Sequence, residues 1–248
     1  MPSAIYPSLE GKRVVVTGGA SGIGAAIVAA FARQGSQTSF VDILDEDADR
    51  LIANLAQAGF TPRYRHLDLR DLDAIADFFL TTGPFDILIN NAASDDRHAL
   101  ADVTPDYWDD RMAVNLRHML FAAKAAAPGM KERGGGAIIN MGSISWHLGL
   151  PDLALYEISK AGIEGMTRAL ARELGPSNIR VTCIVPGNVK TPRQMRWYTP
   201  EGEKEIVDQQ CLKSRILPED VASMALFLAS DDSRMCSGHN YWVDAGWR

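Results

Sequence analysis

The strongest constraint on the fold is a regular alternation of two kinds of segment along the 248 residues. Short runs rich in Val and Ile predict buried strands, and longer stretches with apolar residues three and four apart predict amphipathic helices. The expected strands are 13–17, 37–42, 62–67, 85–90, 137–141, 180–184 and 241–243. The expected helices are 22–34, 45–58, 72–80, 105–132, 153–175 and 218–229. This order predicts a single α/β domain over residues 1–248, a doubly wound parallel sheet of the Rossmann type.

Composition argues against several other classes of protein. The net charge is −6 and no run of Lys or Arg forms a basic stripe, which disfavours nucleic-acid binding. No stretch approaches the 18 consecutive apolar residues of a membrane span, and residues 1–7 lack the features of a signal peptide. The three cysteines, Cys183, Cys211 and Cys236, lack the spacing of a disulfide framework or a zinc site. We therefore expect a cytoplasmic protein that binds no metal, membrane or nucleic acid.

A glycine-rich turn joins the first expected strand to the first expected helix. Its spacing over residues 18–24 is Gly-x-x-x-Gly-x-Gly. Glycines at such a turn let backbone amides approach a pyrophosphate at the positive end of the helix. A tight loop without a ligand is the alternative, but the position between a strand and a helix favours a dinucleotide. The predicted contacts are Gly18, Ser21, Gly22, Ile23 and Gly24.

Asp42 ends the second expected strand and bears on the choice of cofactor. A carboxylate there can accept hydrogen bonds from the adenosine ribose and would repel a 2′-phosphate. Ala20 and Ile43, where a cation for that phosphate would be expected, are uncharged. Asp42 would instead cap the next helix in the alternative interpretation, although Asp45 is better placed as that N-cap. The sequence thus favours NAD over NADP.

Tyr156 and Lys160 lie four residues apart in an expected helix, which places them on one face. A phenol has a reference pKa of about 10, and a nearby cation lowers it. Tyr156 could then act as a general base that Lys160 tunes. By itself this pair is also compatible with a solvated helix surface.

Taken together, these motifs resemble the short-chain dehydrogenase/reductase family over essentially the whole chain. Asn90–Ala93 is similar to its Asn-Asn-Ala-Gly motif, with Ala93 in place of the last Gly, and Pro186–Thr191 is similar to its Pro-Gly-x-Val-x-Thr loop. The resemblance implies four catalytic residues: Asn115, Ser143, Tyr156 and Lys160. It also implies further cofactor contacts at Ile43, Asp68, Leu69, Asn91, Ala92, Tyr156, Lys160, Val189 and Thr191.

The resemblance also implies how the four catalytic residues divide the work. Ser143 would hydrogen-bond the substrate oxygen while Tyr156 accepts the hydroxyl proton. Lys160 would also hold the nicotinamide ribose, and Asn115 would position a water that links Lys160 to solvent. The alternatives are structural: a turn-stabilising hydroxyl for Ser143 and a helix-kinking amide for Asn115.

Four segments narrow the expected substrate: 95–98, 143–149, 197–202 and 241–248. They resemble a bacterial branch of the family that oxidises the anomeric hydroxyl of an aldose to a lactone with NAD. We expect hydride transfer from C1 of an aldopentose, D-xylose, with another aldose such as L-arabinose, a polyol or a hydroxy or keto compound as alternatives. A catalytically silent NAD-binding protein is the alternative from another class.

A sugar pocket needs several hydrogen-bonding groups and an aromatic platform. The expected sugar contacts are Ser143, Tyr156, Asp95, His147 and Asn188, with Trp197 as a candidate platform. Residues 191–213 are polar enough to form a lid over a small hydroxylated ligand. Relatives in this family are commonly tetramers, and the aromatic segment 241–248 is expected at or near a subunit contact. We therefore expect a homotetramer.

Overall fold

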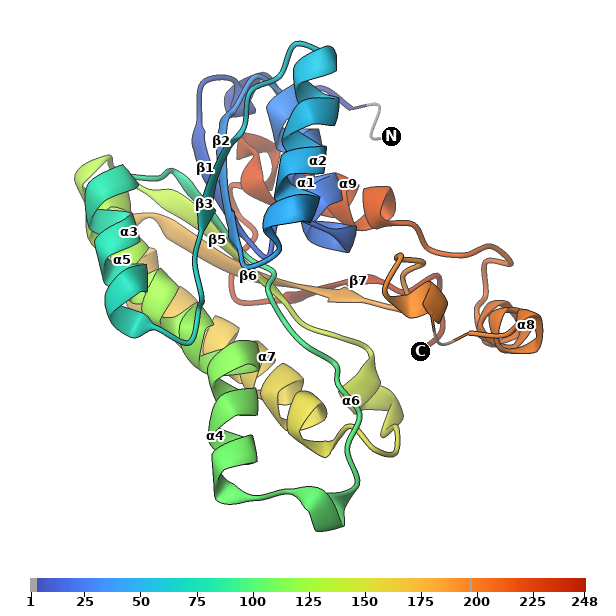
Figure 1. Ribbon diagram of the computed structural model, residues 1–248. Coiled ribbons are helices and arrows are strands. Elements are labelled where there is room, and N and C mark those ends of the chain that lie inside the picture. Colours follow the sequence, from blue (N-terminus) through green and yellow to red (C-terminus); the bar gives the residue numbers. More distant parts are fainter. Residues whose placement is uncertain (1–3, 197) are drawn as a thin grey trace.

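The computed structural model describes residues 4–196 and 198–248 (Figure 1). Seven parallel strands form one sheet in the order β3-β2-β1-β4-β5-β6-β7. The strands are β1 (Arg13–Thr17), β2 (Gln37–Asp42), β3 (Arg63–His66), β4 (Ile87–Asn90), β5 (Gly136–Met141), β6 (Ile179–Pro186) and β7 (Asn240–Val243). Trp197, the candidate aromatic platform, and residues 1–3 lie outside the described residues.

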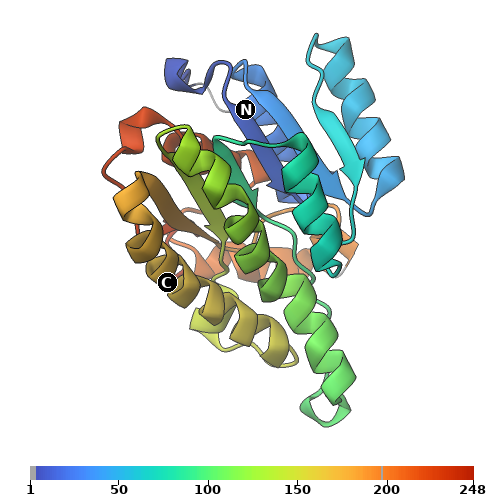
Figure 2. The same ribbon diagram turned by 90° about the vertical axis from the view of Figure 1, so that its left-hand side faces the viewer.

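Helices cover both faces of this sheet, as the two views in Figures 1 and 2 show. One face carries α1 (Gly22–Arg33), α2 (Asp45–Gln57) and α9 (Pro218–Ala229). The other carries α3 (Leu72–Thr82), α5 (His118–Glu132) and α7 (Ala154–Leu174). The remaining helices are α4 (Pro105–Met112), α6 (Ser145–Leu148) and α8 (Pro200–Gln209). Short 3₁₀ turns occur at Pro7–Leu9, Leu100–Asp102, Gly175–Ser177, Gln194–Arg196 and Asp231–Ser233.

The core follows from the side-chain alternation of the strands. Val14 and Val16 point into the apolar cluster beneath α1 and α9, whereas Val15 points into the cluster beneath α3 and α5. All three are fully buried. A strand with both faces covered reads as a continuous apolar run, which is why β1 and its neighbours were recognisable in the sequence.

The expected α/β fold and doubly wound parallel sheet are confirmed. Each expected strand and helix is present, with ends shifted by one or two residues, while α6 and α8 were not expected. The expected helix over 105–132 is interrupted by a π turn at Ala113–Arg117. The expectation that Asp45 caps α2 was wrong, because Leu44 occupies the N-cap and Asp45 is the first helical residue. The Asp45 carboxylate is 2.9 Å from His66 Nδ1 instead.

The chain order of the strands reverses between β1 and β4. Strand β1 pairs with β2 on one side and with β4 on the other. Ligands of open α/β sheets bind beyond the carboxyl ends of the strands at such a reversal. Among the described residues, no helix combines the length and apolar character that a membrane crossing requires.

Candidate active site

The glycine-rich turn between β1 and α1 is shaped by close backbone contacts. A Cβ placed on Gly18 would lie 2.7 Å from Ala92 Cα, and one on Gly24 would lie 1.9 Å from the Gly18 carbonyl oxygen. Gly18 and Gly22 also have φ angles of +65° and +53°, which disfavour other residues. Within the described chain, the Ser21 side chain does not cap α1. The first amides of this 12-residue helix are therefore suited to a phosphate.

Asn91 links this turn to the end of β4. Its Nδ2 donates to the carbonyl oxygens of Thr17 and Gly18 at 3.0 and 2.9 Å, and its backbone N–H donates to Thr17 Oγ1 at 3.0 Å. The backbone N–H of Ala92 donates to the same hydroxyl at 3.2 Å. Asn91 and Ala92 thus hold the two halves of the expected nucleotide site together at the point where the strand order reverses.

Asp42 lies directly beside the glycine-rich turn. Its Oδ2 accepts the backbone N–H of Ala20 at 2.9 Å, and its Oδ1 accepts those of Ile43 and Leu44 at 2.8 and 3.2 Å. A carboxylate offers about four acceptor positions, so one on Oδ2 remains for a ribose hydroxyl. The three amides fix the carboxylate where the sequence places the ribose.

The other expected cofactor contacts border the same edge. The Asp68 carboxylate follows β3 and pairs with Arg70, whose guanidinium lowers its pKa; the partly buried Leu69 comes next. Thr191 lies against the turn, since a Cβ on Gly22 would be 3.4 Å from its Cγ2. Val189 is buried and bridges to Ile216. The narrow turn, the uncapped helix and Asp42 fit a nicotinamide dinucleotide.

Lys160 lies beneath Tyr156 on α7. Its Nζ is 5.2 Å from the centroid of the phenol ring and donates a hydrogen bond of 2.8 Å to the carbonyl oxygen of Met141, the last residue of β5. Lys160 is buried, and desolvation lowers its pKa to about 8. A lysine with so low a pKa is held in place at an energetic cost, which is typical of a functional site.

The pKa of Tyr156 corrects one expectation from the sequence. We expected Lys160 to lower it, but burial is the largest influence and raises it, and the Asp95 carboxylate raises it further. The Ser143 hydroxyl and the Arg193 guanidinium act in the opposite direction. Tyr156 is only half-buried as a residue, so its phenol group carries this desolvation. The sequence spacing could not reveal how strongly the fold encloses it.

Asn115 occupies the π turn between α4 and α5. Its Oδ1 accepts the backbone N–H of Ser94 at 2.7 Å, whereas its buried Nδ2 has no partner among the described residues. A buried amide without a partner costs about 1–3 kcal/mol, and π turns are frequent at functional sites. The kink expected as an alternative is therefore present, together with a donor that remains available to an external group.

Ser143 follows β5 and adjoins the same group. Its Oγ accepts the backbone N–H of Ser145 at 3.1 Å, and the hydroxyl lies close enough to Tyr156 to lower the pKa of the phenol. Ser143 therefore combines the turn-stabilising role considered from the sequence with a position beside the phenol. The structure brings Ser143, Tyr156 and Lys160 together, and Asn115 joins them through the loop that begins at Ser94.

Of the other expected sugar contacts, Asp95 and Asn188 lie near the catalytic group or the lid, whereas His147 does not. Asp95 approaches Tyr156 closely enough to influence its pKa. Asn188 lies at the lid, where its Nδ2 donates to Tyr198 Oη at 2.6 Å and its Oδ1 accepts from Arg215 at 2.9 Å. The structure does not bring His147 to these residues. Its Nε2 is 2.8 Å from Glu164 Oε1, its Nδ1 is 2.8 Å from Arg248, and its side chain is only 6% exposed.

Sequence reasoning missed Glu164, which organises the segment after Ser143. Its Oε1 accepts from the Trp146 indole at 2.9 Å as well as from His147, and its Oε2 accepts from Asn240. Glu164 lies four residues after Lys160, and this spacing could have indicated that the two side chains share one face of the helix. His118, also missed, is buried, its Nε2 is 3.1 Å from the Ala92 carbonyl oxygen, and desolvation lowers its pKa to about 4.

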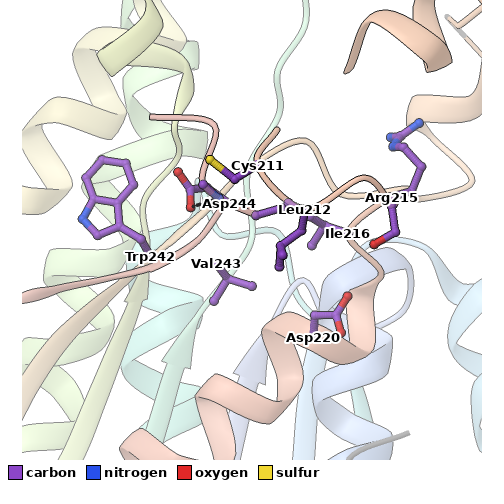
Figure 3. A pocket seen from close by; sticks show the side chains of 11 residues that line it. Cys211, Leu212, Arg215, Ile216, Asp220, Trp242, Val243 and Asp244 are labelled. Carbon is purple, nitrogen blue, oxygen red and sulfur yellow. Dashed lines mark hydrogen bonds between the residues drawn. The ribbon is translucent and has the colours of Figure 1, made fainter. Parts of the chain in front are cut away.

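A hollow of about 510 Å³ lies near the C-terminus (Figure 3). The segment after α8, the start of α9 and residues 242–246 line it, rather than the four expected catalytic residues. The tail closes part of it, because the backbone N–H of Leu212 donates to the Ala245 carbonyl oxygen at 3.0 Å. Within the described ranges, no group of three or more His, Cys, Asp or Glu could hold a metal ion.

Comparison with known proteins identifies the family. The family model described as enoyl-(acyl carrier protein) reductase matches residues 18–248. The chain is 67% identical to a D-xylose 1-dehydrogenase of Caulobacter vibrioides over 248 residues, which are all of both chains. The chain belongs to the short-chain dehydrogenase/reductase family. It is also 44% identical to a probable galactose dehydrogenase of Rhizobium meliloti, covering 99% of this chain and 98% of that one.

Two solved short-chain dehydrogenase/reductase neighbours contain nicotinamide nucleotides. A 3-oxoacyl-(acyl-carrier protein) reductase from Brucella melitensis with bound NAD has a TM-score of 0.87 and 32% identity, covering 98% of this chain and 93% of that one. A blue fluorescent protein from a metagenomic library, in complex with NADPH, has a TM-score of 0.88 and 33% identity, covering 97% and 99%. The chain is thus an oxidoreductase of a family that uses NAD or NADP.

Proposed function

We propose that this protein oxidises D-xylose at C1 with NAD, giving a xylonolactone that hydrolyses to xylonate. The observation that carries the proposal is the group of Ser143, Tyr156 and buried Lys160 in a chain 67% identical to a D-xylose 1-dehydrogenase along its whole length. Asn115 completes this group through its contact with Ser94. A catalytically silent protein would not need to retain a buried lysine at such a cost.

The four residues divide the proton chemistry among them. Ser143 donates a hydrogen bond to the C1 oxygen, and Tyr156 accepts the hydroxyl proton as the C–H bond breaks. NAD supplies the hydride acceptor when bound. The charge of Lys160, whose Nζ is 5.2 Å from the ring centroid, favours the phenolate, while Ser143 and Arg193 oppose the desolvation that raises the phenol pKa. The Nδ2 hydrogens of Asn115, which have no partner among the described residues, are suited to hold a water that links Lys160 to solvent.

The residues around the expected adenosine ribose favour NAD over NADP. Asp42 offers a ribose hydroxyl its remaining acceptor position, and its charge would repel a 2′-phosphate. The exposed neighbour Ile43 provides no compensating cation. The hydrogen bond to the ribose and the repulsion of a 2′-phosphate both depend on the Asp42 carboxylate, so replacement of Asp42 tests them together.

The polar groups near Tyr156 favour a small hydroxylated substrate. Asp95 lies at the catalytic end, while Asn188 and Tyr198 form a hydrogen-bonded pair at the lid. The lid itself contains α8, and Glu203 of this helix forms an ion pair with Arg215 just beyond the lid. L-arabinose, which differs from D-xylose in configuration at C4, is the second candidate, because the chain also resembles a probable galactose dehydrogenase.

A substrate panel tests the assignment. D-xylose, L-arabinose and D-glucose are supplied at equal concentration with NAD, beside an aliphatic alcohol, and NADH absorbance is followed. We expect D-xylose to be fastest, L-arabinose slower by roughly tenfold to a hundredfold because one hydroxyl is misplaced, and D-glucose poorer still. NADH formation from the alcohol but from none of the sugars would refute the sugar assignment and leave the family intact.

The assembly and location follow the same proposal. We propose a homotetramer with residues 241–248 at or near a subunit contact, since Trp242 borders this hollow and, with Asp244 and Arg248, also lines a second one. The cytoplasm is the proposed location, because NAD is available there and the three cysteines are free. Light scattering and cell fractionation test these two points separately.

A further inference from the structure

A charged network joins the lid to the loop that follows β4. Arg193, in the lid, lies with its Nε 3.1 Å from Asp95 Oδ1 and its NH2 2.8 Å from Asp96 Oδ1. The same NH2 donates to Ser94 Oγ at 3.3 Å. One guanidinium therefore reaches three consecutive residues of the loop whose first backbone N–H bonds the catalytic Asn115.

The two carboxylates in this network have different surroundings. The Asp96 side chain is 57% exposed and that of Asp95 is 29% exposed. Exposed ion pairs contribute little free energy, so the contact with Asp96 by itself does not explain why Arg193 is held there. At Asp95, Arg193 takes Oδ1 and Gln194 donates to Oδ2 at 2.6 Å. Two adjacent lid residues thus fix both oxygens of a single, partly buried carboxylate.

A second arginine, on α4, also holds the loop that follows β4. Arg111, whose side chain is 14% exposed, lies 2.8 Å from Asp96 Oδ2 and donates to Ser94 Oγ at 3.1 Å. Loss of Arg193 would therefore leave Ser94 and Asp96 held by Arg111. Asp95, in contrast, would lose the guanidinium that neutralises it.

Three charged groups face the Tyr156 phenol. Lys160 lies beneath it on the same helix, Asp95 approaches from the loop after β4, and Arg193 approaches from the lid. The charge of Asp95 opposes formation of the phenolate, and the charge of Arg193 favours it. The contact between Arg193 and Asp95 therefore acts on both the orientation of a sugar-binding carboxylate and the proton acceptor.

We propose that Arg193 is a positioning residue for the reaction: it orients Asp95 toward a sugar hydroxyl and cancels the Asp95 charge beside Tyr156. The sugar part of this inference rests on the proposed function. The oriented carboxylate keeps acceptor positions for a hydroxyl, which donates to it as the sugar binds. The neutralised carboxylate no longer hinders transfer of the C1 hydroxyl proton to the phenol.

The test compares three variants in steady-state kinetics across pH. Arg193→Gln removes the charge and the planar guanidinium, Arg193→Lys keeps the charge but loses the guanidinium, and Arg33→Gln removes an exposed charge from the last turn of α1, outside the lid and the catalytic group. We expect Arg193→Gln to raise the sugar KM about tenfold, the loss of one charge-assisted hydrogen bond. The same variant should shift the midpoint of kcat/KM against pH upward by about half a unit or more.

The other two variants distinguish the effect of the charge from that of the guanidinium geometry. Arg193→Lys should restore the midpoint but not the KM, and Arg33→Gln should match the wild type in both. A raised KM in Arg193→Gln with an unmoved midpoint would overturn the proposal, because a purely structural contact would give that result. Agreement of Arg193→Gln with Arg33→Gln would overturn it as well. The variants are assayed with the substrate that the wild type oxidises fastest, so failure on D-xylose would concern only the proposed function.

Discussion

Replacement of Lys160 by Met should stabilise the protein against unfolding at neutral pH. Burial lowers the lysine pKa from 10.5 to about 8, which corresponds to a cost of about 3 kcal/mol for the charged form in the folded state. Met fills similar volume without a charge but cannot donate to the Met141 carbonyl oxygen, a loss of about 1 kcal/mol. We therefore expect Lys160→Met to be more stable by about 2 kcal/mol at pH 7.

The difference in the free energy of unfolding between the wild type and Lys160→Met should change sign with pH. Below pH 8, Lys160 is charged in both the folded and the unfolded chain, and the full cost of burying the charge applies. Between about 8 and 10.5 the folded protein loses the proton first, so the free energy of unfolding of the wild type rises with pH. The advantage of Lys160→Met should accordingly disappear across that window, ending with the wild type more stable by about 1 kcal/mol.

Urea unfolding at a fixed protein concentration, followed by tryptophan fluorescence at several pH values, measures this difference. Lys131→Met, the same substitution at an exposed position of α5, is the matched control and should differ from the wild type by a constant amount. Titrations of groups that the charge of Lys160 does not influence cancel in the comparison. If the wild type and Lys160→Met change in parallel from pH 7 to beyond the lysine range, the inference that a costly buried charge lies beneath Tyr156 is refuted.

Four further substitutions or truncations test the rest of the site. Tyr156→Phe should lower kcat by about a thousandfold, because the proton acceptor is lost, while NADH fluorescence shows binding largely intact; a kcat near that of the wild type would contradict this role. Asp42→Ala should narrow the preference for NAD over NADP in kcat/KM, mainly by relieving repulsion of the 2′-phosphate, and an unchanged ratio would count against it. Glu164→Gln should lower kcat/KM about tenfold and speed hydrogen exchange in 143–148, because one amide cannot accept from both Trp146 and Asn240; unaltered exchange would show that the segment is held otherwise. Protein lacking Trp247 and Arg248 should form a weaker oligomer by light scattering, and an equally stable one would argue against a contact at the tail.

The sheet was predictable because its strands are buried on both faces. The continuous apolar runs of β1, β4 and β5 carry that information locally, as do the glycines whose Cβ atoms would collide at the β1–α1 turn. Family resemblance then indicated Ser143, Tyr156 and Lys160. The apolar runs and the spacing of the glycines can be recognised from neighbours within a few positions of the sequence, although Gly18 itself is constrained by the distant Ala92.

The remaining features depend on residues far apart in the chain. Arg248 occupies a nitrogen of His147 from 101 positions away, and Arg193 meets Asp96 from 97 positions away. The direction of the Tyr156 pKa depends on how much of the fold encloses the phenol. The π turn was hidden for a different reason: Ala113–Arg117 lies in a pattern that is helical throughout, and only the tertiary fold decides where the extra residue sits.

The π turn also fixes the direction in which α4 points. A single π turn is equivalent to one residue inserted into an α-helix, and each residue turns the helix by about 100°. Deletion of Val114 would restore an unbroken helix and swing Arg111 around the axis, away from the loop that it anchors. Loss of this one residue, which lies outside every strand, would thereby separate the contacts between Arg193 and the loop after β4 from the Asn115 side chain. The register of the sheet would stay unchanged.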